Sequence, residues 1–320
     1  MILNAKDPNF RYNPYPFFRQ LRQEAPIARV EPFGAWAISR YDDVIALLRN
    51  PTLFSSANMS PEDGEGAQFI LQTRALIGTD PPDHARLRGI IGLTFTPPRI
   101  QAWEGLIRSH ARTLLAAIKD NSAVDLVTAF TAPLPTLVIG DILGIDRERT
   151  ADFIRWTDTL LTWRNREHNK AEQTAQEIVD YFTELIDRRR QQPTDDLISH
   201  LIAACDHNQR LTPRELLAFL RLILVAGTET TTHLLGNTIR AICTGLLWRS
   251  LRVSPFLVPQ AIEETLRFDG PVLALARRTA EDTEIYGQHV SKNDTILALV
   301  ASANRDESVP PWRACKHASP

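Results

Sequence analysis

The sequence is poor in cysteine and has no apolar run of membrane-spanning length. Its three cysteines, Cys205, Cys243 and Cys315, are widely spaced, form no CxxC pair and are odd in number, which excludes a disulfide framework. No purely apolar stretch approaches the roughly 20 residues that a membrane span requires. Residues 1–22 contain neither a signal-peptide core nor an anchor. We therefore expect a soluble protein of the reducing cytoplasm, without a membrane association.

An excess of charge of either sign is also missing. Lys and Arg number 36 against 38 Asp and Glu, for a net charge of -2. No basic stripe with interleaved aromatic residues is present, so nucleic acid is not expected as a partner. The hydrophobic content of 43% is that of an ordinary globular protein. Repeats, low-complexity tracts and breaks in composition are absent, so we expect one domain over residues 1–320, although the length alone suggests about two.

Helical periodicity dominates what the sequence does contain. Over 35–50 we expect a strand followed by a helix capped near Asp42. Residues 57–79 show little periodicity and should form a long loop, of a length typical of lids and binding elements. Asp80 is expected to cap a helix that begins with the prolines at 81–82. Further helices are expected at 13–26, 99–120, 122–142, 147–163, 170–190 and from Thr194.

The longest expected helix begins at a clear N-terminal signal. Thr212 as cap, Pro213 at the first helical position and Glu215 three residues after the cap form a capping box. From there helical periodicity continues to about Leu247, some 35 residues or roughly 50 Å at 1.5 Å per residue. The first half is apolar on all sides, which indicates a helix inside the core.

The pattern becomes β-like after Pro271. Positions 283–301 contain two strand-like runs around a Ser-Lys-Asn-Asp turn at 291–294. The sequence therefore predicts a mainly α protein with a small β portion.

An unusual stretch, LVAGTETTTHLLG, occupies the middle of the long helix. Ala226, Gly227 and Thr230 are neighbours on one face and would form a shallow groove. The Thr230 hydroxyl can also bond a carbonyl one turn back, and Glu229 must be paired or solvated. Two interpretations stay open: close helix packing at Gly227 with Glu229 reaching solvent, or a flat ligand against the groove with an acid and a hydroxyl beside it.

Three further patterns are less specific. Glu264 and Arg267 are i,i+3 partners on a helix and in isolation would form an ordinary surface ion pair. His84 and Arg88 are i,i+4 neighbours, and two adjacent arginines occupy 277–278. They form either a solvated basic surface or cations that converge on a ligand with two carboxylates.

Taken together, these motifs resemble successive landmarks of the cytochrome P450 superfamily of haem-thiolate monooxygenases, in its soluble bacterial form. The resemblance spans nearly the whole chain, and the landmarks follow one another in the family's order. They are NPYPFFRQLR, YDDVIALLRNPTLFSS, TDPPDHARLRGIIGLTFTPPRI, LVAGTETTTHLLG, EETLRFDGPV and ANRDES.

The resemblance implies a role for each residue of the long helix. Ala226 and Gly227 would form the oxygen-binding groove over the haem. Glu229 and Thr230 would be the acid–alcohol pair that delivers protons to dioxygen, and we expect these two to be the catalytic residues. Oxygen activation needs a groove, a proton path and otherwise dry surroundings, which these residue types supply.

The resemblance also implies the cofactor, haem b, and the residues around it. His84, Arg88 and Arg277 would hold the haem propionates; Arg277 is favoured over its neighbour by its spacing to Asp282. The ion pair at 264–267 would be structural and would stabilise the haem-side core.

The activity implied is hydroxylation or epoxidation of a hydrophobic small molecule, such as a polyketide or a fatty acid, with O2. A ferredoxin or flavodoxin would supply the electrons. Substrate would lie under the loop at 57–79, near Val272 and Leu273, and beneath the helix pair at 147–190.

The sequence departs from the resemblance at the haem ligand. The family's ligand is a cysteine in a glycine-rich loop after a phenylalanine, downstream of ANRDE. After Ser308 the sequence reads VPPWRACKHASP, and Cys315 has neither preceding glycines nor a following helix to favour a thiolate. We therefore expect a P450 fold that is C-terminally incomplete, with 309–320 as a non-native tail.

A second departure is TGLLWRSLRVSPF at 244–256, which does not resemble the family's loop there. Frameshifts in this segment and after Ser308 would explain both departures, and translation of the downstream DNA in the other frames tests them. Two functional hypotheses follow: a monooxygenase of family type, or an inactive pseudoenzyme or remnant that binds at most a hydrophobic ligand. The reduced carbon monoxide difference spectrum separates them.

Overall fold

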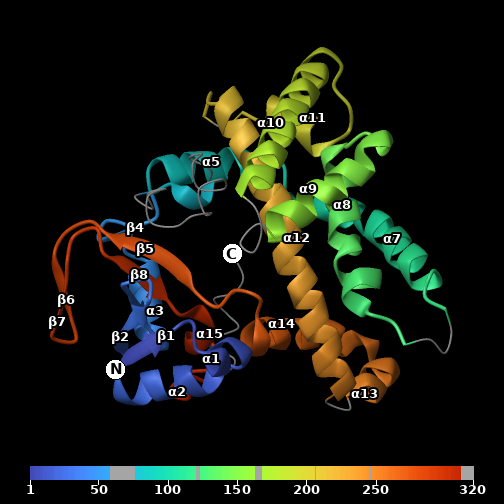
Figure 1. The fold of residues 1–320 in the computed structure, drawn as a ribbon. Helices are drawn as coiled ribbons and strands as arrows, with labels where there is room; N and C mark the ends of the chain where they lie inside the picture. The colour runs from blue at the N-terminus through green and yellow to red at the C-terminus, as the bar shows by residue number, and fades with distance from the viewer. Residues whose placement is uncertain (58–75, 120–122, 163–167, 206, 245–246, 311–320) are drawn as a thin grey trace. The chain divides into compact units, whose positions relative to one another are not determined.

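The computed structural model describes residues 1–57, 76–119, 123–162, 168–205, 207–244 and 247–310 (Figure 1). The chain divides into two compact units, one formed by Met1–Met59 with Asn237–Pro320 and the other by Ser60–Gly236. None of the helices within the described ranges is both long and apolar enough to cross a membrane. As predicted, the fold is mainly α with a small β portion.

The first unit contains a six-stranded sheet with the order β1-β2-β3-β8-β5-β4. β3 and β8 pair in parallel, with Trp36 opposite Ile296, whereas β5 pairs antiparallel with both β8 and β4. Strands from the two ends of the chain therefore share one sheet, with β8 and β5 between β3 and β4. The strands are β1 (Ile2–Asn4), β2 (Ile27–Glu31), β3 (Ala35–Ile38), β4 (Phe54–Ser55), β5 (Leu275–Thr279) and β8 (Thr295–Ala298).

The β region after Pro271 has one turn more than predicted. The turn at 291–294 is present, because the Asp294 amide donates to the Ser291 carbonyl at 3.0 Å. A separate hairpin, β6 (Thr283–Ile285) with β7 (Gln288–Val290), closes through Tyr286 and Gly287. Both turn residues have positive φ, 51° and 72°, as a tight two-residue hairpin requires. Tyrosine rarely adopts this conformation, so this turn was hard to predict from the residue types.

Helices α2 and α3 contribute buried side chains to two apolar clusters that they share with strands of this sheet. Phe18 and Leu21 of α2 belong to one cluster, and Val44 and Leu47 of α3 belong to a second, which includes Ile296. These two clusters form the core of the unit. The helices are α1 (Pro8–Tyr12), α2 (Tyr15–Glu24), α3 (Tyr41–Leu48), α13 (Leu247–Val253), η6 (Pro255–Leu257), α14 (Val258–Asp269) and α15 (Val300–Ala303).

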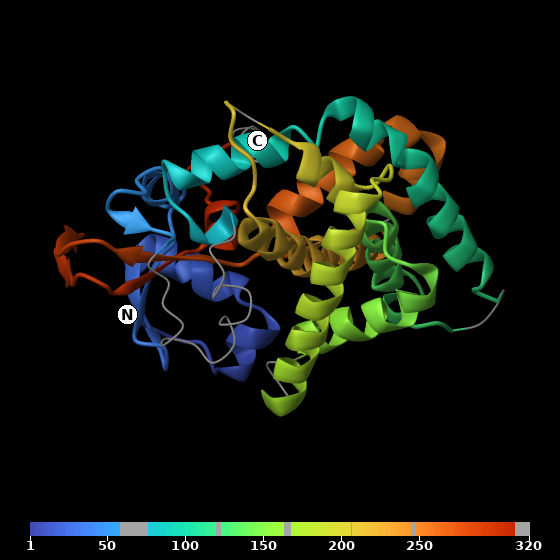
Figure 2. The ribbon, with the colours of Figure 1, turned by 90° about the horizontal axis from the view of Figure 1, so that it is seen from above.

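The second unit is helical in its described residues. Trp156 of α9 and Phe182 of α10 are fully buried in its core, and α9 lies beside α10 in both ribbon views (Figures 1 and 2). Its elements are η2 (Leu76–Gly78), α5 (Asp83–Gly92), α6 (Pro97–Ala102), α7 (Glu104–Ala116), the π-helical turn η3 (Val127–Thr131), α8 (Pro133–Leu143), η4 (Arg147–Arg149), α9 (Thr150–Thr162), α10 (His168–Gln191) and α11 (Leu197–Ala203).

The longest helix, α12 (Pro213–Thr244), begins in the second unit and ends in the first. Its N-terminus is where the capping box predicts it, and its C-terminus lies close to the expected position. Leu220 and Leu224 are completely buried, and Phe219 and Val225 nearly so. This confirms that the first half of the helix is buried on several sides.

Some predicted helix starts were wrong. α5 begins at Asp83, after the two prolines, and its cap position is Pro82 rather than Asp80. α11 begins at Leu197 with Asp196 as its cap, three residues after the expected start at Thr194, whereas α3 begins at Tyr41, close to the cap expected near Asp42. For α5 and α11, a proline or a second polar residue nearby offered an alternative start.

The predicted helix at 122–142 is interrupted. Its first part includes the π-helical turn, and regular α-helix begins only at Pro133. Most of the loop predicted at 57–79 lies outside the described residues.

Candidate functional site

The start of α12 is held by the predicted capping box. The Thr212 amide donates to the Glu215 carboxylate at 2.7 Å, and the Glu215 amide donates to Thr212 Oγ1 at 3.2 Å. Two amides without intrahelical partners are satisfied reciprocally, which fixes the position of the Glu215 side chain.

In the middle of α12 the small residue Ala226 is exposed next to buried residues. Ala226 is exposed, whereas Thr228 is fully buried and Val225 nearly so. The Thr230 hydroxyl donates to the Ala226 carbonyl at 2.6 Å, which confirms the predicted bond one turn back. The face between these two residues therefore carries a methyl group and a hydroxyl oxygen.

Gly227 lies next to α8. A Cβ atom at this position would lie 3.0 Å from Ile139 Cδ1 and 3.3 Å from Ile139 Cγ1. The missing side chain thus lets α8 approach α12 closely, as the packing interpretation requires. A role of Gly227 in an oxygen-binding groove stays a prediction.

Glu229 is partly exposed. Among the described residues its side chain has no hydrogen bond or ion pair. Access to solvent meets the requirement that this carboxylate be solvated if it is unpaired.

The three basic side chains of α5 point in two directions. His84 and Arg88 lie one turn apart on one face, and their side chains bond no other described residue. Arg86 faces another way: it forms an ion pair with Glu215 of α12 and lies 4.0 Å from Asp83. The helix therefore leaves two cations available to an anionic ligand on one side.

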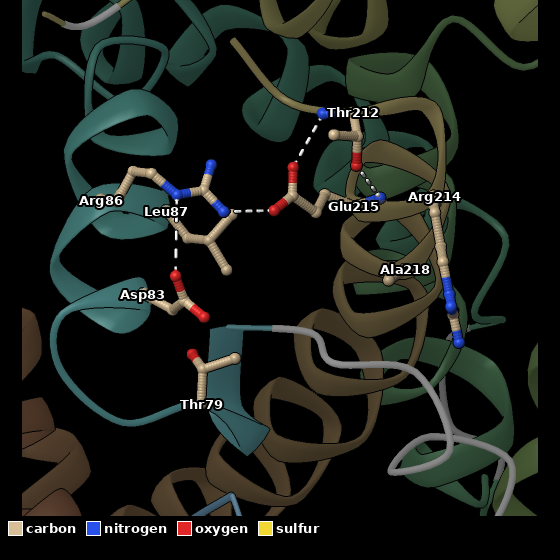
Figure 3. A pocket seen from close by; sticks show the side chains of 8 residues that line it. All are labelled: Thr79, Asp83, Arg86, Leu87, Thr212, Arg214, Glu215 and Ala218. Carbon is tan, nitrogen blue, oxygen red and sulfur yellow. Dashed lines mark hydrogen bonds and ion pairs between the residues drawn. The ribbon is translucent and has the colours of Figure 1, made fainter. Parts of the chain in front are cut away.

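A cavity of about 510 Å³ separates α5 from the start of α12 (Figure 3). Thr79, Asp83 and Leu87 line one side, and Ala218 lines the other. Burial acts to raise the pKa of Glu215, but hydrogen bonds from Arg86 and the Thr212 amide lower it below its ordinary value.

Sequence reasoning did not find the Arg86–Glu215 contact. The two residues are far apart in the chain, and no local pattern links them. In the sequence, Glu215 already has a local partner in the capping box, and Arg86 has one in Asp83. Neither residue therefore indicates that it has a partner in another helix.

The predicted ion pair at 264–267 is bidentate. Arg267 donates to both carboxylate oxygens of Glu264, at 2.6 and 2.8 Å, and its third nitrogen donates to the Asn304 carbonyl at 2.6 Å. The Arg267 side chain is only 12% exposed. The arginine thus joins α14 to the end of α15, which an ordinary surface pair would not do.

Arg277 lies in the middle of β5, opposite Ile296 of β8. Its guanidinium donates to the Ala276 carbonyl at 2.8 Å, and the neighbouring Arg278 points to the other face of the sheet. Arg277 and the 264–267 pair belong to one compact unit, whereas His84 and Arg88 belong to the other.

The chain matches the cytochrome P450 family at residues 136–243 and 255–311. The putative cytochrome P450 YjiB of Bacillus subtilis is 34% identical over 316 residues, which are 96% of this chain and 78% of YjiB. The chain belongs to the cytochrome P450 family.

Solved structures agree with this P450 assignment. Cytochrome P450 CYP109Q5 from Chondromyces apiculatus superposes with a TM-score of 0.89 at 33% identity, covering 98% of this chain and 80% of that one. The polyketide biosynthesis cytochrome P450 PksS of Bacillus subtilis is 33% identical over 96% of this chain and 79% of its own length. The fold predicted from the sequence landmarks is therefore confirmed, and so is the family's haem cofactor.

The described residues fit part of a haem site. Haem carries two carboxylates, and His84 and Arg88 are basic residues on one face without protein partners among the described residues. Ala226 of α12 is exposed and carries only a methyl group.

The thiolate ligand is not supplied by the described cysteines. Cys205 and Cys243 are free and exposed, and neither follows a Phe-Gly pattern. Cys315 lies outside the described residues.

Proposed function

We propose that this P450 oxidises a hydrophobic small molecule of the polyketide or fatty-acid class, by hydroxylation or epoxidation, with electrons from a ferredoxin or flavodoxin. The observation that carries the proposal is the centre of α12, where Ala226 is exposed and the Thr230 hydroxyl lies directly beside it.

The printed names of relatives support the substrate class. PksS is named for polyketide biosynthesis, and CYP109E1 from Bacillus megaterium was solved with testosterone and with corticosterone. P450BioI was solved with an acyl carrier protein ligated to hexadec-9Z-enoic acid. These ligands share a large apolar skeleton with few polar groups, and the apolar Val272 and Leu273, both partly exposed, suit such a molecule.

The haem, when bound, supplies the iron centre at which dioxygen is activated. His84 and Arg88 would hold its propionates through charge-assisted hydrogen bonds, a role that the sequence also predicts for Arg277. Ala226 leaves space on the α12 face, and Thr230 holds a proton at Oγ1 that Glu229 replenishes from solvent. The Glu264–Arg267 pair acts structurally, by holding α14 against Asn304.

The reduced carbon monoxide difference spectrum tests this function. The chain reconstituted with haem is reduced and exposed to carbon monoxide, and turnover of testosterone and of a C16 fatty acid is measured with a surrogate ferredoxin. A red-shifted band with product supports a thiolate-ligated monooxygenase. No band and no product would leave only an inactive protein that binds a hydrophobic ligand.

A further inference from the structure

One interhelical ion pair, Arg86 with Glu215, bridges α5 and α12 above the cavity of Figure 3. Both side chains are largely shielded, with exposures of 28% and 19%. Glu215 presents a pre-oriented carboxylate, because its other oxygen accepts the Thr212 amide. A partly buried, charge-assisted contact to a fixed partner defines the position of Arg86 closely.

The cavity makes this contact important for the placement of α5. Leu87 and Ala218 face the empty space from opposite sides, so apolar packing between the two helices is incomplete at this level (Figure 3). Close-packed side chains normally fix how one helix is rotated against another. Here the ion pair adds a constraint to that of Leu87 and Ile91, which belong to the same buried cluster as Leu216 of α12.

Helical geometry relates Arg86 to the two free cations. At 3.6 residues per turn, Arg86 is two residues from both His84 and Arg88 and is therefore rotated by about 160° from each of them. The buried Leu87 lies between the two sides. Holding Arg86 at one edge of α5 therefore sets the direction in which His84 and Arg88 point from the other.

Glu215, the partner of Arg86, lies on the same face of α12 as Ala226. Ala226 follows Glu215 by about three turns, or about 16 Å along the axis, and is rotated by only about 20° from it. The ion pair thus attaches α5 to the same face of α12 that carries Ala226.

We propose that Arg86 and Glu215 are positioning residues for the cofactor: their ion pair fixes the rotation of α5 and thereby the direction in which His84 and Arg88 meet the haem propionates. The inference rests on the proposed function, in which the Ala226 face of α12 and these two basic residues bind haem. Neither Arg86 nor Glu215 touches the cofactor in this arrangement.

Binding of metal-free protoporphyrin IX to the full chain tests the inference without catalysis. Porphyrin fluorescence gives dissociation constants for the diacid and for its dimethyl ester, in which the propionate charges are removed. We expect Arg86→Ala to weaken diacid binding by about tenfold, the equivalent of about 1.4 kcal/mol, and to leave ester binding unchanged. Arg86→Lys should restore part of the loss.

For Glu215, the second residue of the ion pair, a substitution of the same size and shape is available. Glu215→Gln retains an oxygen that accepts the Thr212 amide, so the capping box persists while the charge facing Arg86 is lost. It should weaken diacid binding as Arg86→Ala does. Arg108→Ala is the control, because it removes an exposed arginine that pairs with Glu104 within α7 and should change neither ligand.

The outcomes separate the inference from the proposed function. If Arg88→Ala weakens diacid binding but Arg86→Ala and Glu215→Gln do not, the positioning role is wrong and the haem site stands. If Arg86→Ala weakens diacid and ester equally, the pair only stabilises the fold and the inference fails. If neither His84→Ala nor Arg88→Ala affects diacid binding, the proposed haem site itself is wrong.

Discussion

At the scale of single residues, Gly144 and Asp196 show how a backbone conformation and a buried charge depend on each other. Gly144 ends α8 with φ of 71°, and a Cβ atom there would collide with the Asp196 carboxylate. Arg189 donates to both the Gly144 carbonyl and Asp196. The carboxylate also accepts from Thr194 Oγ1 at 2.6 Å and from the Ser199 amide at 2.7 Å, so it caps α11 at the same time.

Substitution of Gly144 should therefore destabilise the fold. We expect Gly144→Ala to lower the free energy of unfolding by at least about 2 kcal/mol, from the left-handed conformation and the displaced carboxylate together. Urea denaturation measures the change. Gly105→Ala in α7 is the matched control, since nothing lies within 4 Å of its added Cβ and stability should be unchanged or slightly higher. Equal effects of the two changes would contradict the argument.

The same carboxylate predicts a pH dependence of stability. Burial acts to raise the pKa of Asp196, but the bonds from Thr194, Ser199 and Arg189 lower it below its ordinary 3.8. Because the folded pKa is the lower one, the charge stabilises the fold above pH 3.8, and this contribution is lost as the pH falls through the folded value.

The variant Asp196→Asn measures this contribution. It should be less stable than the wild type at pH 7, and the two unfolding free energies should converge as the pH is lowered from about 5 to about 2. Parallel curves over that range, followed by urea denaturation at each pH, would show that the charge of Asp196 is not the cause.

At the scale of elements, the contact between α8 and α12 depends on Gly227. A glycine inside a helix costs about 1 kcal/mol relative to alanine, yet an alanine Cβ here would lie 3.0 Å from Ile139 Cδ1. The gain in helix propensity from alanine is offset because its Cβ would displace the Ile139 side chain. The glycine is thus explained by helix packing, independently of any ligand.

A double-mutant cycle tests this contact. Gly227→Ala alone should change stability little, whereas in an Ile139→Val background, which lacks Cδ1, it should raise the free energy of unfolding by about 1 kcal/mol. Gly236→Ala, in the same helix with nothing within 4 Å of the added Cβ, should raise it by a similar amount in either background. Additive effects at Gly227 and Ile139 would show that the two side chains do not compete for space.

Local signals explain which helix boundaries could be predicted. The capping box at Thr212 acts within one turn, and α12 starts where it predicts. Before α5 the signals conflicted, since a capping Asp80 precedes two prolines, and the helix begins only at Asp83. Asp196 caps α11 because Arg189 and Thr194 hold its carboxylate, and the first of these partners comes from another helix.

At the scale of the whole molecule, the order of the sequence landmarks was sufficient to predict the family and its mainly α fold. The pairing of β3 with β8 was not predictable, because it joins Trp36 to Ile296 across most of the chain. The prediction of a single domain over residues 1–320 stays a prediction, as do the haem-binding roles of His84, Arg88 and Arg277.

The sequence alone determined the features that arise within a turn or two of helix: the cap of α12, the Thr230–Ala226 bond and the Glu264–Arg267 pair. Partners separated by three or four residues are brought together by the helix itself. Only the tertiary structure decided that Gly227 accommodates Ile139, that Arg267 reaches Asn304 and that Arg86 binds Glu215. These contacts join segments far apart in the chain, so they depend on how the helices pack, which no local pattern encodes.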